Sequence, residues 1–76
     1  MSEPVTLDAT GLKCPLPVLK ARKAMREVPE GGVLRVIATD PGAIKDFEHF
    51  CKTTGHQLIG QRDEDGTLVF DIRKIG

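Results

Sequence analysis

Two prolines flank a single leucine directly after a cysteine, in the segment Gly11-Leu12-Lys13-Cys14-Pro15-Leu16-Pro17, and they restrict where a helix can begin. A residue that precedes proline is disfavoured in helical geometry, so Cys14 is predicted to be an N-cap. Pro15 then takes the first helical position and Pro17 lies in the first turn, where prolines break no helical hydrogen bond. The segment predicts a stiff helix start, after a turn at Gly11, with a thiol at its tip.

Hydrophobic periodicity around this segment predicts a βαβαββ order. Val5 to Ala9 alternates apolar and polar residues, as a half-buried strand does, and Pro15 to about Val28 repeats apolar residues at helical spacing. The remaining elements are predicted as a strand over 33–39, a helix from Pro41 to a C-terminal cap at Gly55, a strand over 56–62 interrupted at Gly60, a hairpin turn over 63–66, and a strand over 68–73.

Right-handed strand–helix–strand connections place both helices on the same face of one sheet. We therefore predict an α+β protein, a two-layer α/β sandwich with a mixed four-stranded sheet and two helices on one face. Residues 1–76 form a single domain, in which residues 1–4 are expected to be disordered. The other face of the sheet would be partly open to solvent or to a second chain.

Size and charge exclude several classes of function. A chain of 76 residues buries only about 60% of its unfolded surface, so chemistry is expected at the surface or shared with a partner. A net charge of zero argues against a general nucleic-acid or membrane binder, and no apolar run is long enough to span a bilayer. With two cysteines and no signal peptide, a cytoplasmic location is expected, and no cofactor is implied.

The thiol of Cys14 is the strongest candidate for chemistry. A thiolate is the attacking form of cysteine, and a helix N-terminus favours negative charge. Pro17 has no N–H, so Leu16 is the main backbone donor predicted for the sulfur. These features predict a pKa of Cys14 below the ordinary value of a cysteine thiol.

Basic residues gather on the helix that follows Cys14. The segment 12–26 contains five basic residues and no acidic one. A helical projection places Lys20, Lys23 and Arg26 opposite the apolar stripe. They could be ordinary solvated side chains, but the coincidence of charge and apolar residues beside a thiol favours a partner-binding surface. That surface is predicted to comprise Lys13, Leu16, Leu19, Lys20, Lys23 and Arg26, with Asp40 in a secondary role.

Other candidate residues favour structural roles. Cys51 follows Ile44 and Phe47 on one helix face, so a buried thiol is favoured over a resolving cysteine, although a disulfide with Cys14 stays open. His49, Cys51 and His56 lack the paired spacing of a zinc site, and no metal is expected. Asp40 precedes Pro41 as an N-cap would.

The residues from Leu7 to Pro17 resemble the signature of the TusA family, also called SirA-like or YedF-like. The resemblance extends over nearly the whole chain through Ala38-Thr39-Asp40-Pro41, Phe50-Cys51, Gly55-His56 and Ile72-Arg73-Lys74. It implies a fold like the C-terminal domain of bacterial translation initiation factor three. It also implies a sulfur carrier, in which Cys14 accepts a persulfide from a cysteine desulfurase or rhodanese and passes it to a downstream acceptor protein.

The resemblance leaves the sulfur pathway open among tRNA thiolation, molybdenum cofactor assembly and oxidation of reduced sulfur. Leu16 departs from the acidic residue that is common between the prolines in the tRNA-thiolation branch, so another pathway is at least as well supported. Such a relay would be a sulfurtransferase rather than a conventional turnover enzyme. The alternatives are a non-catalytic regulatory module that binds a partner protein through the basic helix face, and RNA contact by that face, which neutral charge and few aromatic residues disfavour.

Overall fold

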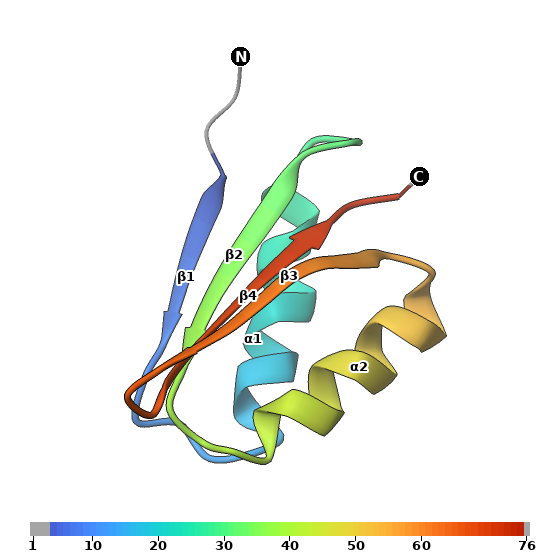
Figure 1. Cartoon of the computed structure of the whole chain (residues 1–76). Helices are drawn as coiled ribbons and strands as arrows, with labels where there is room; N and C mark the ends of the chain where they lie inside the picture. The colour runs from blue at the N-terminus through green and yellow to red at the C-terminus, as the bar shows by residue number, and fades with distance from the viewer. Residues whose placement is uncertain (1–3, 76) are drawn as a thin grey trace.

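The computed structural model describes residues 4–75 and has the predicted βαβαββ order (Figure 1). Residues 1–3, which belong to the segment predicted to be disordered, lie outside the described residues. The elements are β1 (Val5–Ala9), α1 (Leu16–Ala24), a 3-10 helix η1 (Met25–Glu27), β2 (Val33–Ala38), α2 (Ala43–Thr54), β3 (Gln57–Glu64) and β4 (Thr67–Arg73). The predicted α+β class is confirmed.

The four strands form one mixed sheet in the order β1-β2-β4-β3. β1 is parallel to β2, whereas β4 is antiparallel to both β2 and β3. Figure 1 shows α1 and α2 on the same face of this sheet, which makes two layers. Because β1 and β2 run in the same direction, the loops that follow them leave from the same edge of the sheet.

The core lies between the sheet and the two helices. Phe47 of α2 is fully buried, and its ring centroid lies 4.8 Å from that of Phe70 in β4. Leu34, Val36 and Ile72 line the same inner face of the sheet and are also fully buried. Alternate residues of β2 and β4 point to the other face, where Arg35 Nε donates to Asp71 Oδ1 over 2.8 Å.

The helix boundaries differ from the prediction at the end of α1 and at the start of α2. α1 ends at Ala24, and the chain tightens into η1 instead of continuing as an α-helix to Val28. Val28 is extended, with φ −84° and ψ 128°, because it precedes Pro29. α2 begins at Ala43 with Gly42 as its N-cap, so the predicted start at Pro41 after an Asp40 N-cap is wrong, while the predicted cap at Gly55 is confirmed.

The hairpin between β3 and β4 is tighter than predicted. Its central residues are Asp65 and Gly66, with φ of 53° and 88°, and positive φ at both positions is typical of a type I′ turn. The expected interruption at Gly60 is present as a register shift between Leu58 and Gly60. No helix within residues 4–75 has the length and apolarity needed to cross a membrane.

Candidate functional site

Cys14 lies in the loop between β1 and α1, beside the loop that follows β2 (Figure 1). Gly11 has a φ of 78°, which glycine adopts without strain, and its N–H donates to Thr39 Oγ1 over 2.9 Å. Thr39 directly follows β2. This hydrogen bond therefore joins the two loops at the carboxyl ends of the parallel strands.

The backbone at Cys14 forms a turn rather than the predicted helix cap. The Leu16 N–H donates to the Lys13 carbonyl over 2.8 Å, and the Cys14–Pro15 peptide bond is cis, as in a type VI turn. α1 begins at Leu16 with Pro15 as its N-cap. The prediction of Cys14 as N-cap is wrong. The Leu16 N–H, which was the backbone donor expected for the sulfur, donates to the Lys13 carbonyl instead.

Asp40 fixes the position of the cysteine from the opposite loop. One oxygen, Oδ2, accepts the Cys14 N–H over 2.6 Å, and the other, Oδ1, accepts the Gly42 N–H over 3.0 Å. The hydrogen bonds from Cys14 and then from Gly42 lower the pKa of Asp40, and the charge of Lys13 adds to this effect. Asp40 thus anchors the cysteine loop, in addition to bonding the turn that precedes α2.

The sulfur of Cys14 has a carboxylate partner in α2. Cys14 Sγ donates a hydrogen bond to Oδ2 of Asp46, which lies in the first turn of that helix. This hydrogen bond, then partial desolvation and then the negative charges of Asp46 and Asp40 raise the pKa of Cys14 to about 11. The prediction of a lowered pKa is therefore wrong, although the Cys14 side chain is exposed as expected.

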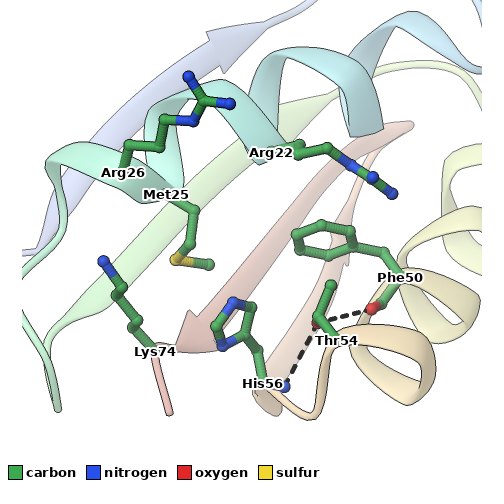
Figure 2. Close-up of a pocket in the computed structure, with 7 residues that line it drawn as sticks. All are labelled: Arg22, Met25, Arg26, Phe50, Thr54, His56 and Lys74. Carbon is green, nitrogen blue, oxygen red and sulfur yellow. Dashed lines mark hydrogen bonds between the residues drawn. The ribbon is translucent and has the colours of Figure 1, made fainter. Parts of the chain in front are cut away.

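The predicted partner-binding residues in and beside α1 are exposed, and three of them line two different hollows. Leu16 and Leu19 are 47% and 53% exposed. Lys20 and Lys23 line a shallow hollow beside Leu7 of β1. Arg26 lies on the other side of α1, where Figure 2 shows it with Arg22, Met25, Phe50, Thr54, His56 and Lys74 around a pocket of about 240 Å³.

A groove between α1 and α2 continues this pocket toward the thiol. A second hollow of about 190 Å³ shares Arg22 and Phe50 with the first and extends to Pro15 and Asp46. The Arg22 guanidinium lies 5.9 Å from the centre of the Phe50 ring, within the range of a cation–π contact. The groove therefore has an apolar floor and basic groups, and one end of it lies at the carboxylate that binds Cys14.

The other candidate residues form neither a disulfide nor a metal site within residues 4–75. Cys51 is buried and has a raised pKa because of that burial, which confirms the buried thiol, and both cysteines are free. His49 Nε2 lies 3.4 Å from Thr53 Oγ1, and His56 Nδ1 accepts the Ile75 N–H. Within residues 4–75, no three His, Cys, Asp or Glu side chains come together as a metal site requires.

Two site residues, Thr39 and Asp46, were missed from the sequence. Asp46 is 32 positions from Cys14, and an acidic residue in a first helical turn has an ordinary explanation in the helix dipole. The signal that could have found both is the strand–helix–strand connection predicted for the first two strands, since such a crossover makes β1 and β2 parallel. That pairing brings the residues after the two strands to one edge of the sheet.

The chain matches the profile of the family described as Sulfurtransferase TusA over residues 5–74. The chain belongs to the TusA family. Among TusA relatives, the "Sulfur carrier protein TusA" of Pseudomonas entomophila (strain L48) is 55% identical over 69 residues, which cover 91% of this chain and 86% of the relative. The protein of the same name from Allochromatium vinosum is 52% identical over 68 residues, which cover 90% of each chain.

A solved structure supports the same family fold. The SirA-like protein from Desulfitobacterium hafniense superimposes with a TM-score of 0.81 at 28% sequence identity, and the match covers 95% of this chain and 99% of that one. The residues that build the Cys14 site, from β1 to the first turn of α2, all lie within the span matched by the TusA profile.

Proposed function

We propose that this TusA-family chain is a sulfur carrier, in which Cys14 accepts a persulfide from a cysteine desulfurase or rhodanese and relays it to a downstream protein. The observation that carries the proposal is the exposed, free thiol of Cys14 at the edge of the sheet. The backbone N–H of the same residue donates to Asp40, which fixes its position. The relatives named as sulfur carriers support it. A reducing cytoplasm would keep Cys14 in the thiol form that the relay needs.

The transfer is an exchange of one sulfur atom between two cysteines. Cys14 Sγ forms a bond to the terminal sulfur of the donor persulfide, and the sulfur–sulfur bond of the donor breaks with its electron pair on the donor cysteine. The proton lost from Sγ passes to that departing thiolate. A second exchange of the same kind unloads Cys14 onto the acceptor, so no external oxidant or reductant is consumed.

Intact mass tests the carrier role directly. Incubation with a cysteine desulfurase and cysteine is expected to add about 32 Da to the protein, the mass of one sulfur atom, and reductant is expected to remove it. Cys14→Ser is expected to lose the adduct, while Cys51→Ala, which changes the buried thiol, keeps it. A wild-type protein without the adduct, or a Cys14→Ser variant that retains it, would reject the proposal.

We further propose that partners dock on exposed residues in and beside α1: Lys13 in the preceding loop, Leu16, Leu19, Lys20 and Lys23 in α1, and Arg26 in η1. Leu16 separates the two prolines beside the thiol, so its exposed side chain is expected to influence which sulfur pathway the chain serves. In the same assay, reversing Lys20 and Lys23 to Glu is expected to slow loading by the desulfurase about tenfold at low salt. The same double variant should load from a small-molecule persulfide at the wild-type rate, and the control Lys52→Glu should load from the desulfurase at the wild-type rate. If the double variant is slowed equally with the desulfurase and with the small-molecule persulfide, docking at these lysines is excluded.

A further inference from the structure

The side chain of Cys14 is held against the first turn of α2. Its Sγ donates to Asp46 Oδ2, and its N–H donates to Asp40 Oδ2. Gly42, the N-cap of α2, lies directly beside this side chain: a Cβ at Gly42 would make ordinary van der Waals contact, 3.4 Å from Cys14 Cβ and 3.8 Å from Sγ. The sulfur is therefore placed by contacts with the segment that follows β2, and not by its own helix.

Ionisation of this sulfur would add a third negative charge to a small region that already holds two carboxylates. Asp46 bonds the sulfur directly, and Asp40 bonds the backbone of the same residue. The positive groups near these carboxylates do not contact the sulfur: Lys13 acts on Asp40, and Arg22 lines the groove beside Asp46. The imidazole of His49 lines the same groove. The nearest charged partner of Sγ is thus a carboxylate, which favours the thiol over the thiolate.

We propose that Asp46 is a positioning residue for Cys14, whose carboxylate directs the sulfur and holds it as a thiol, so that the unloaded carrier reacts slowly with small electrophiles. This inference rests on the proposed function, in which Cys14 is the carrier. The consequence is selectivity: a thiol of this kind stays unmodified in solution and transfers sulfur only when a docked donor supplies a departing thiolate to take its proton. Asp46 also lines the groove between α1 and α2, so a docked partner has access to it.

The test is the pH dependence of alkylation of Cys14 by iodoacetamide in the purified full chain. In the wild type, the rate is expected to rise with a midpoint near 11. In Asp46→Asn, the midpoint is expected to move toward 9.0, the ordinary value. If the midpoint falls by one to two pH units, more of the thiol is ionised near pH 8, but the less basic thiolate is also a weaker nucleophile. The net expectation is about three- to tenfold faster alkylation of Asp46→Asn near pH 8.

Two matched variants separate this role from a general effect of charge or folding. Asp46→Glu retains the carboxylate and should keep the midpoint above 9.0, the ordinary value, whereas Glu48→Gln removes a charge from an exposed position of the same helix and should leave the profile unchanged. The proposal would be overturned if Asp46→Asn were alkylated at the wild-type rate or more slowly near pH 8, or if Glu48→Gln shifted the midpoint by the same amount as Asp46→Asn. If Asp46→Asn fails to fold, a wild-type midpoint at or below 9.0 would overturn it. Alkylation needs no sulfur donor, so this result is independent of sulfur loading.

Discussion

At the scale of single residues, Asp40 connects the cysteine loop to the rest of the fold. Its two oxygens accept the N–H groups of Cys14 and Gly42, which belong to different loops. A charged acceptor makes such hydrogen bonds stronger than neutral ones. The position of the thiol relative to α2 therefore depends on one carboxylate that does not touch the sulfur itself.

Replacement of Asp40 by Ala is expected to lower the thermal midpoint by a few degrees at pH 7. The pKa of Asp40 is lowered from 3.8 in the folded state, so its contribution is present above 3.8 and is lost as the pH falls through the lower folded value. The difference in thermal midpoint between wild type and variant should accordingly shrink in acid. Calorimetry between pH 2 and pH 7 would measure it.

Amide hydrogen exchange gives a local check on the same variant. The Cys14 and Gly42 amides should exchange faster in Asp40→Ala, since both lose their acceptor. The Thr10 amide, which donates to Asp8 near the end of β1, serves as an internal control and should exchange at an unchanged rate. Unaltered exchange at Cys14 would contradict the role assigned to Asp40.

The environment of Cys14 marks the limit of local inference at this scale. The motif correctly indicated an exposed thiol after a turn at Gly11. It predicted the wrong direction for the pKa, because the group with the largest effect on the sulfur is not a backbone donor of the motif. The deciding group is Asp46, which is 32 positions away and reaches the sulfur only through the fold. A pKa depends on spatial neighbours, which a local motif does not contain.

At the scale of elements, the type and order of the helices and strands were predictable because they follow from the spacing of apolar residues along the sequence. The boundaries of the helices and strands depend instead on individual residues. Pro29 explains why the helical pattern ends before Val28, a signal present in the sequence. The start of α2 at Ala43 instead of Pro41 leaves Asp40 outside the helix, where one side-chain oxygen bonds Gly42 and the other binds the neighbouring loop.

The two glycines that flank α2 give a matched pair of substitutions. Gly55 has a φ of 84°, and a Cβ there would meet no atom of residues 4–75 within 4 Å, so Gly55→Ala should destabilise by about 1–2 kcal/mol through backbone conformation alone. Gly42 has a φ of −64°, so Gly42→Ala should be neutral or stabilise by up to about 1 kcal/mol. Urea unfolding would compare them, and equal effects would contradict this explanation.

At the scale of the whole molecule, parallel pairing of β1 and β2 creates the site. It brings the loops that carry Cys14 and Asp40 to the same edge of the sheet, and α2 leaves from that edge with Asp46 in its first turn. The predicted crossover topology contained this arrangement. The predicted topology did not specify how α2 is rotated about its own axis. That rotation is determined by the packing of Phe47 and Phe50 into the core.

Phe47 therefore tests how the core supports the site. A domain of 76 residues has a total stability of about 4–11 kcal/mol. Phe47 is fully buried between Phe50 and Phe70, so Phe47→Ala should lose about 3–5 kcal/mol of the free energy of unfolding and leave the protein marginally folded. The milder Phe47→Leu should stay folded, yet let α2 shift enough to weaken the contact between Cys14 and Asp46.

Urea denaturation measures the first effect, and the alkylation profile of Cys14 measures the second. Ile59, which is 48% exposed at the bulge of β3, supplies the control: Ile59→Ala should change the unfolding free energy by less than about 0.5 kcal/mol and leave the alkylation midpoint in place. A Phe47→Leu protein that is destabilised but keeps the wild-type alkylation profile would show that the loops hold the thiol without help from the core. A lower midpoint in Phe47→Leu, absent in Ile59→Ala, would mean that the orientation of α2 controls the protonation of Cys14.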